Sequence, residues 1–171
     1  MFPSDVAIAK HIKCVDSRGE LVITHEGAIN DVVAIKRSIS KKNVLRGLHF
    51  QKAPYTQRKI IEVIDGSIIG MLINMDVDSS NYGKFYSMEI HSSEECVLYI
   101  PSHYAHGFLT TTDVVFQYLT IGAYSADAEI AITPPKNFYE VQNIESKLLT
   151  ISEKDRLAFC YETYFSSGKP S

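Results

Sequence analysis

The stretch NVLRGLHFQKAPYTQRKIIEVIDG, residues 43–66, decides the predicted fold and carries the first candidate for chemistry. Two short apolar runs, 44–50 and 59–64, flank a polar segment, and runs of this length bounded by turn residues predict β-strands. His49 lies between leucine and phenylalanine in the first run. Such a histidine is most often a hydrogen-bonded core residue, but a half-buried imidazole with a fixed tautomer also suits a general base. The stretch alone leaves both interpretations open.

Strand signals of the same kind fill the chain up to about residue 121. The predicted strands cover 12–15, 20–24, 32–39, 44–50, 59–64, 67–74, 85–91, 96–101, 106–110 and 114–121. Turn signals separate them. Asp65-Gly66 between two apolar runs is the sharpest hairpin signal, and Glu26-Gly27 is a further turn. Ten short strands at this spacing predict a mainly β protein, a jelly-roll (cupin-like) antiparallel β-barrel.

The strand pattern ends after about residue 125. Ser152, with Asp155 three residues later, resembles a capping box and predicts a short C-terminal helical segment that runs towards Phe159. No internal repeat, low-complexity segment or linker divides residues 1–171, so we expect a single domain.

Composition places the chain among ordinary globular proteins, with 45% hydrophobic residues, 22% charged residues and a formal net charge of -3. This charge argues against binding to nucleic acids or membrane surfaces. No apolar run approaches the roughly 20 residues that span a bilayer. The first residues lack the pattern of a signal peptide, and the widely spaced Cys14, Cys96 and Cys160 form no CxxC motif. We therefore expect reduced thiols and a cytoplasmic location.

A second informative stretch is IPSHYAHGF, residues 100–108, in which Pro and Gly bracket a turn with two histidines. His103 and His106 are candidate metal ligands, as in metal-binding cupins. The usual signature of those proteins, two histidines one residue apart with a following glutamate, is absent. We therefore expect no metal and no other cofactor, with a metal-dependent cupin enzyme as the alternative.

Aromatic and cationic residues add two further open choices. Tyr118, within a predicted strand, is either a packing residue or, if it faces the interior opposite a histidine, a residue that donates or accepts a proton. The cations are either solvated surface charges or ligands of an anionic group such as a diphosphate. This set comprises Arg18, Arg46, Arg58 and Lys59. Arg46 best fits the second interpretation, because apolar residues and glycine flank it.

Taken in chain order, these sequence stretches and candidate residues resemble the nucleotide-sugar epimerase family typified by dTDP-4-dehydrorhamnose 3,5-epimerase. The resemblance runs from about Asp16 to Asp155. It rests on VLRGLHFQ (44–51), the Gln57-x-Lys59 step, IPSHYAHGF (100–108) and SEKD (152–155). The family resemblance implies a jelly-roll homodimer that needs no metal. It also implies a nucleoside-diphosphate 4-keto-6-deoxy sugar as the substrate.

The resemblance also implies catalytic roles for the matching residues. His49 would abstract the proton next to the C4 ketone, and Asp155 would orient its imidazole. Lys59 would stabilise the enolate, as an oxyanion hole does, and Tyr118 would return a proton on the opposite face. We also expect Lys59 to make Tyr118 more acidic.

Substrate-binding residues transfer in the same way. Arg46 and Arg18 would bind the diphosphate. Gln51, His106 and Tyr124 are further candidates for the pocket.

Several positions depart from the family pattern. Leu21 and Ile23 stand where the family has Phe and Glu, and residues 34–38 replace an asparagine-containing stretch. Gly70 stands where an aspartate commonly partners the histidine that matches His106, and the chain has no tryptophan. These changes affect substrate recognition, so inversion at C3 or C5 alone and a nucleotide other than dTDP are both open. Isomerases of 4-keto sugars and a noncatalytic sugar-binding jelly roll remain alternatives.

Overall fold

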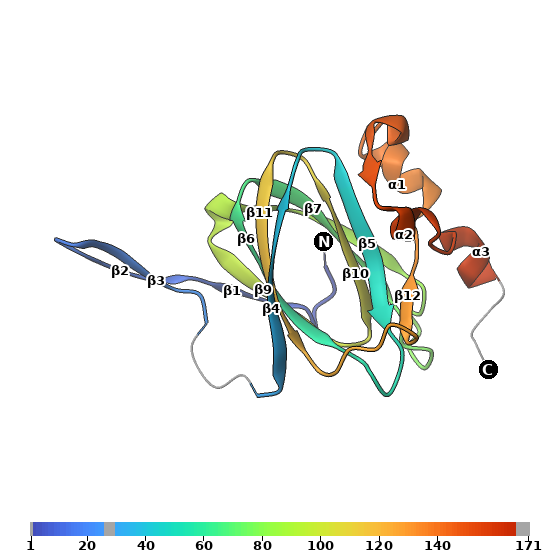
Figure 1. The fold of residues 1–171 in the computed structure, drawn as a ribbon, viewed down its shortest axis with the longest axis horizontal. Helices are drawn as coiled ribbons and strands as arrows, with labels where there is room; N and C mark the ends of the chain where they lie inside the picture. The colour runs from blue at the N-terminus through green and yellow to red at the C-terminus, as the bar shows by residue number, and fades with distance from the viewer. Residues whose placement is uncertain (1, 26–29, 167–171) are drawn as a thin grey trace.

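The computed structural model describes residues 2–25 and 30–166, in which two β-sheets pack face to face (Figure 1). The strand order of the first sheet is β1 (Ala7–Lys10), β9 (Cys96–Ile100), β6 (Arg58–Asp65), β11 (Val114–Ile121) and β4 (Val32–Ser40). The order of the second is β12 (Glu129–Ala131), β5 (Val44–Gln51), β10 (Tyr104–Thr110), β7 (Ser67–Asn74) and β8 (Phe85–His91), with β13 (Thr150–Ile151) also beside β5. Only the β13–β5 pair is parallel among these pairs. The mainly β, antiparallel jelly-roll prediction is confirmed.

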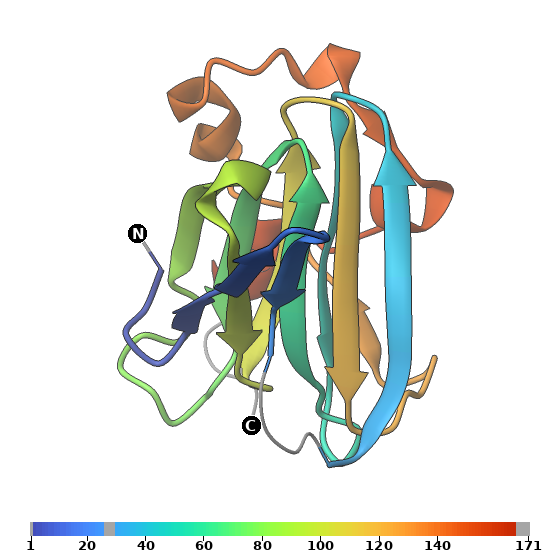
Figure 2. The same cartoon turned by 90° about the vertical axis from the view of Figure 1, so that its left-hand side faces the viewer.

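A separate hairpin of β2 (Ile12–Asp16) and β3 (Gly19–Ile23) projects away from the two sheets (Figures 1 and 2). It follows β1, the edge strand of the five-stranded sheet. Its two strands pair only with each other, so the described part of this chain leaves both of its outer edges unpaired.

All ten predicted strands form, with ends that shift by about two residues or fewer. The sequence prediction missed β1, β12 and β13. The last two contain three and two residues, which is too short for an alternating pattern to be recognised.

The Asp65-Gly66 prediction was half right. Gly66 has a φ of +85°, and a Cβ there would lie 2.2 Å from the backbone oxygen of Asp113, so a glycine is required in this tight turn. However, β6 and β7 belong to different sheets, so the turn crosses between the sheets and does not close a hairpin. The predicted turn at Glu26-Gly27 lies outside the described residues.

The predicted C-terminal helix exists but is short. In α2 (Glu153–Arg156), the Ser152 side chain accepts a hydrogen bond from the Asp155 N–H at 3.1 Å, as the capping pattern predicts. The helix does not reach Phe159, because the Phe159 N–H donates to the Ala131 oxygen of β12 at 2.9 Å and the chain becomes extended there. None of the described helices is long and apolar enough to cross a membrane.

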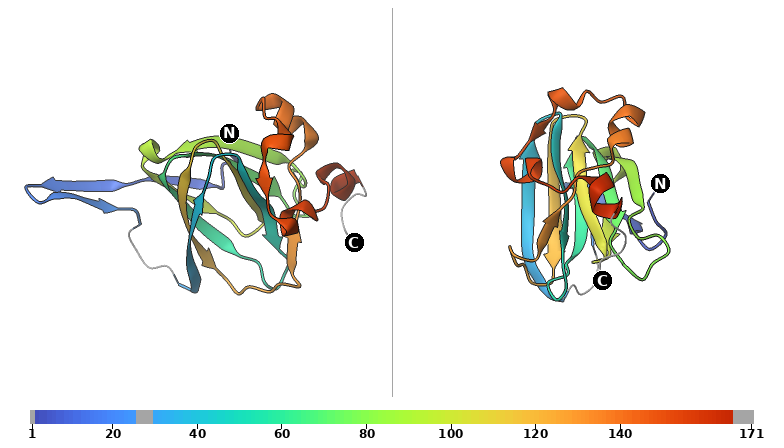
Figure 3. Two further views of the ribbon diagram at one scale, coloured as in Figure 1. Left: turned by 45° about the horizontal axis from the view of Figure 1, so that its top comes forward. Right: turned by 90° about the vertical axis from the view of Figure 1, so that its right-hand side faces the viewer.

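Two other short helices, α1 (Lys136–Val141) and α3 (Tyr161–Ser166), and the 3-10 turns η1 (Ser92–Glu94) and η2 (Ser146–Leu148) were not predicted. The C-terminal helices cover the outer face of the six-stranded sheet (Figure 3). Their side chains pack there with Leu45, Leu48 and Met71, so this sheet is buried on both faces.

A β-bulge in β5 sets the geometry of the interior. His49 pairs with His106, and Arg46 pairs with Phe108. Between these two pairs the chain advances three residues along β5 but only two residues along β10. Side chains alternate along a strand, and residues 46 and 49 would face opposite sides without the extra residue. With the bulge, both side chains face the space between the sheets.

Glycine makes this bulge possible. Gly47 has a φ of +87°, and a Cβ there would lie 2.8 Å from the backbone oxygen of His106. On the facing strand, a Cβ at Gly107 would lie 2.6 Å from the backbone oxygen of Arg46. The two backbones therefore approach more closely than any other residue type permits.

We predict that Gly47→Ala lowers the free energy of unfolding by at least about 2 kcal/mol, because the methyl group adds a backbone clash to the strain of a positive φ. Urea unfolding followed by circular dichroism measures the change. Gly19→Ala is the matched control, since Gly19 has a φ of +126° but no atom within 4 Å of the new Cβ. Equal losses in the two variants would contradict the proposed close approach.

Candidate active site

The centre of the site is a hydrogen bond between the side chains of two residues 106 positions apart in sequence. The Nε2 atom of His49 on β5 lies 2.6 Å from Oδ1 of Asp155 on α2. Asp155 is buried, and its second oxygen accepts a hydrogen bond from the Gly47 N–H at 3.3 Å. Burial acts to raise the pKa of Asp155, but the hydrogen bond and charge of His49 outweigh it and hold the pKa below its usual value. The carboxylate therefore stays ionised and fixes the imidazole.

A short backbone connection brings Asp155 to this position. Thr150 and Ile151 of β13 run parallel to Val44 and Leu45 of β5, and the Thr150 N–H donates to the Asn43 oxygen at 2.8 Å. The chain then turns at the Ser152 cap, and α2 follows directly, so that the Asp155 carboxylate reaches Gly47 and His49 of β5.

Lys59 on β6 reaches into the same space from the opposite sheet. Burial lowers the pKa of this lysine to about 8; the Glu129 carboxylate acts against the shift, and the Lys36 charge reinforces it. Most Lys59 side chains are therefore still cationic at neutral pH. An ammonium held in a partly dehydrated site stabilises developing negative charge strongly.

Tyr118 on β11 lines the cavity together with His49 and Lys59. The expectation that Lys59 makes this phenol more acidic was wrong. Burial raises the pKa of Tyr118, while the charge of Arg46, rather than that of Lys59, acts in the other direction. The phenol therefore keeps its proton at neutral pH, as a proton donor must.

Two pockets meet at these residues. The first, here named the Tyr124 pocket, has a volume of about 270 Å³, and the second, the Arg46 pocket, about 280 Å³. His49, Lys59 and Tyr118 line both. The Tyr124 pocket also contains Lys36, Gln51, Gln57 and Glu129, and the Arg46 pocket contains Ser38, His106, Phe116, Lys154 and Asp155. The two pockets together offer room for a small ring between His49 and Tyr118, with a substituent on either side.

The structure brings most predicted substrate-binding residues into these pockets. Arg46 lines one of them, and its Nε donates to the Ser40 hydroxyl at 3.2 Å. Gln51 lines the other, where its oxygen accepts the Ser125 N–H at 3.1 Å, so it also holds the following turn. Tyr124 lies at the rim, and its hydroxyl donates to Glu129 at 2.8 Å.

Arg18 is the exception. It lies in the turn of the projecting β2–β3 hairpin, outside both pockets, and its guanidinium bonds to Asp16 of the same turn at 2.5 Å. Within a single chain, the predicted contact between Arg18 and the pocket residues is therefore not formed, because the hairpin extends away from the sheets.

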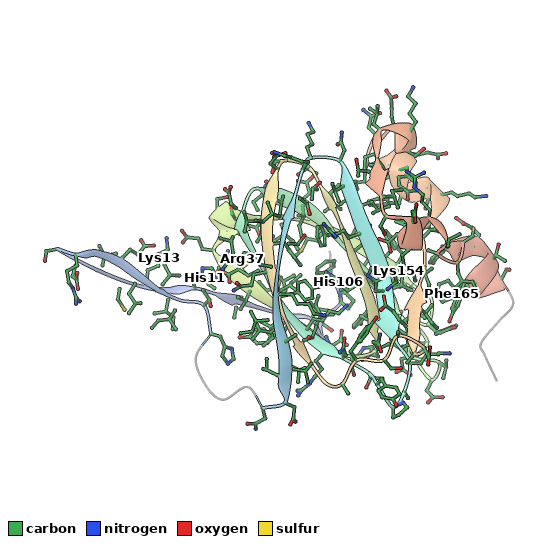
Figure 4. The ribbon with its side chains drawn as sticks, in the orientation of Figure 1. His11, Lys13, Arg37, His106, Lys154 and Phe165 are labelled. Carbon is green, nitrogen blue, oxygen red and sulfur yellow. The ribbon has the colours of Figure 1, made fainter. Side chains whose placement is uncertain are left out.

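His106 lies between the two sheets (Figure 4). Its Nε2 is buried and has no hydrogen-bond partner among the described residues. Burial, reinforced by the charges of Lys59 and His49, holds the pKa of His106 well below its usual value. The departure at Gly70 has a steric reason: a Cβ there would lie 2.9 Å from Ile90 and 3.1 Å from Phe2. Apolar side chains fill the place of an acidic partner, so His106 is a neutral imidazole.

Sequence reasoning missed three charged pocket residues, Lys36, Glu129 and Lys154. Glu129 accepts hydrogen bonds from Tyr124 and, at 2.5 Å, from Lys154, which links β12 to α2 at the edge of the site. Lys154 lies within the SEKD motif, whereas nothing local distinguishes Glu129. Lys36 could have been found from its position in the predicted strand 32–39, because alternate residues of this strand face the interior.

The two histidines of residues 100–108 lie in different places and do not face a common site. His103 bonds to Asp5 at 3.0 Å on the surface, whereas His106 is buried inside. In the described part of the chain, no group of three or more His, Cys, Asp or Glu residues is arranged to hold a metal ion.

The fold and site together define a β-sandwich protein with a histidine–carboxylate pair, a lysine and a tyrosine around one cavity. The family described as dTDP-4-dehydrorhamnose 3,5-epimerase matches residues 5–162, and the chain belongs to this family of nucleotide-sugar isomerases.

Individual relatives agree with this assignment. The chain is 32% identical to the dTDP-4-dehydrorhamnose 3,5-epimerase of Escherichia coli K12, over 71% of this chain and 66% of that protein. The crystal structure of the Sulfolobus tokodaii enzyme is 28% identical, with a TM-score of 0.79 over 95% of this chain and 93% of that one. The Bacillus anthracis enzyme, crystallised with TDP and PPi bound, is 25% identical, with a TM-score of 0.79 over 91% and 93%.

We predict that Lys59 titrates near pH 8, far below the value of 10.5 for a free lysine, because burial disfavours its charge. An NMR titration of isotope-labelled lysine side chains measures this, and Lys59→Met assigns the signal by removing it. If every lysine signal titrated above about pH 10, the proposed burial of this ammonium would be wrong.

Proposed function

We propose that the protein is an epimerase of a nucleoside-diphosphate 4-keto-6-deoxyhexose of the dTDP-4-keto-6-deoxyglucose type. The observation that carries the proposal is the placement of the His49–Asp155 pair on one sheet, with Tyr118 and Lys59 on the other, around one cavity. A base and an acid on opposite walls are what inversion of a carbon centre requires.

In the first step, His49 takes the proton from the carbon next to the C4 ketone. The electron pair of that C–H bond moves into the ring, and the carbonyl becomes an enolate whose charge rests on the C4 oxygen. Asp155 stabilises the imidazolium that forms, and the ammonium of Lys59 stabilises the enolate oxygen.

In the second step, Tyr118 donates its proton to the same carbon from the opposite face, and the ketone re-forms. Before the next turnover, the phenolate regains a proton from solvent and the His49 imidazolium releases its proton to solvent. Burial favours the neutral phenol, so Tyr118 enters the reaction in the protonated form. Centres C3 and C5 both flank the ketone, and the proposal covers inversion at either or both.

The nucleotide part of the proposal rests on the cations of the pockets and on relatives. Arg46 can pair with phosphate oxygens, and the Bacillus anthracis relative was crystallised with TDP and PPi bound.

The three cysteines are unpaired in the structure, which supports the proposed cytoplasmic location.

We further propose a homodimer. The projecting hairpin exposes apolar side chains, among them Val15 at 73% and Leu21 at 63%. The outer face of the edge strand β4 is also apolar and exposed, with Ile39 at 78%. Two such surfaces on every chain suit a two-fold contact in which each hairpin lies on its partner, and this contact would carry Arg18 to the partner's pocket.

The proposed activity predicts deuterium exchange from D2O into dTDP-4-keto-6-deoxyglucose at C3, C5 or both, followed by proton NMR. We expect His49→Ala to slow exchange by about 100-fold or more, because it removes the base. We expect Tyr118→Phe to retain exchange and to lose inversion, because the tyrosine acts only after the proton has left.

His91→Ala is the matched control, since His91 on β8 lines neither of the two pockets. If the wild type bound nucleotide sugars but exchanged no proton in dTDP-, CDP- or GDP-linked substrates, the noncatalytic jelly roll would replace the proposal.

The proposed dimer predicts a mass of twice 19.2 kDa by light scattering after gel filtration. A Val15→Asp and Leu21→Asp double variant should become monomeric, because charges replace apolar contacts in the hairpin. Leu157→Asp is the control, since Leu157 is 87% exposed on another part of the surface. A monomeric wild type would contradict the proposal.

A further inference from the structure

Most charges around the two pockets are compensated. Lys154 pairs with Glu129, and Asp155 pairs with His49. Three cations have no carboxylate within ion-pair distance among the described residues: Lys36, Arg46 and Lys59. Clusters of uncompensated cations around a cavity favour an anionic ligand.

Two of these cations already have a place in the proposed reaction. In that proposal Lys59 would face the ketone oxygen, and Arg46, which lines the other pocket, would pair with phosphate oxygens. Lys36 has none, and the stretch around it, residues 34–38, is where this chain departs from its family's pattern.

The position of Lys36 is well defined. It lies on the inward-facing side of β4, opposite Tyr118 in the neighbouring strand β11. Its Nζ lies 5.7 Å from the centroid of the Tyr118 ring and 5.9 Å from that of the Tyr124 ring. Both contacts fall within the range of a cation–π interaction, so the ammonium is held between the proposed acid and the tyrosine at the rim.

Lys36 also faces the reacting centre electrostatically. Lys36 and Lys59 line the same pocket, and the positive charge of Lys36 acts to lower the pKa of Lys59. Lys36 is itself exposed to solvent, whereas Lys59 is half-buried. A sugar held between His49 and Tyr118 with its ketone at Lys59 would therefore direct its nucleotide-bearing side outwards, towards the rim on which Lys36 lies.

We propose that Lys36 binds the diphosphate of the substrate at the rim of the Tyr124 pocket. This inference rests on the proposed function and deepens it, because it assigns this chain a phosphate-binding cation at a position outside the family motifs. The β4 and β5 edges of the site would then each present one cation, Lys36 and Arg46, to the substrate. A lysine ammonium is a point charge on a flexible side chain and lacks the rigid planar geometry of a guanidinium. It can therefore bind a diphosphate in several conformations.

The test is calorimetric titration of wild type, Lys36→Gln and Arg37→Gln with dTDP and with thymidine. We expect Lys36→Gln to weaken dTDP binding about tenfold or more, because it removes a charge-assisted hydrogen bond, and to leave thymidine binding unchanged. Lys36→Arg should restore most of the affinity. Arg37→Gln is the matched control, since Arg37 lines neither of the two pockets and bonds to Gln117 at 3.0 Å.

The outcomes are separable. Equal dTDP affinity in wild type and Lys36→Gln would overturn the inference while leaving the epimerase proposal intact. Equal weakening of dTDP and thymidine would also overturn it, because the lysine would then act through the tyrosine rings and not on the phosphates. A wild type that binds no nucleoside diphosphate and exchanges no substrate proton would overturn both proposals together.

Discussion

The register of β5 against β10 is the constraint on which the site depends. One extra residue in β5, at Gly47, turns Arg46 and His49 to the same side of a strand whose side chains otherwise alternate. The same shift points Leu48 to the outer face, where it is fully buried under the C-terminal segment. A single bulge therefore places the proposed base His49, the cation Arg46 and the core residue Leu48 at once, and facing glycines allow the backbones to approach closely enough.

The pair of His49 and Asp155 also depends on this bulge, because the bulge helps to hold Asp155 in place. The Gly47 N–H donates to Asp155, so the residue that forms the bulge also holds the carboxylate. Asp155 serves two purposes: its N–H is capped by Ser152, and its carboxylate binds His49. The sequence predicted a helix cap that includes Asp155, and the family resemblance implied a contact between Asp155 and His49. The structure contains both contacts, because the backbone and the side chain of Asp155 form separate hydrogen bonds.

Burial tunes the lysine and the tyrosine in opposite chemical directions. It lowers the pKa of Lys59 because it disfavours the cation, and it raises the pKa of Tyr118 because it disfavours the phenolate. The error in the expected acidity of Tyr118 came from counting a neighbouring charge and omitting desolvation. Both groups nevertheless remain protonated at neutral pH, which is the state that enolate stabilisation and proton return require.

The sequence by itself determined the ten main strands, the glycine turn at residue 66 and the cap at Ser152, because each depends on neighbours a few residues away. Through its motifs, it also indicated the residues for which we propose catalytic roles. Only the tertiary structure decided that β6 and β7 belong to different sheets, that Arg18 lies away from its own pocket, and that Lys36 faces the site. Sheet membership and burial depend on contacts between segments far apart in the chain, and no local pattern records them.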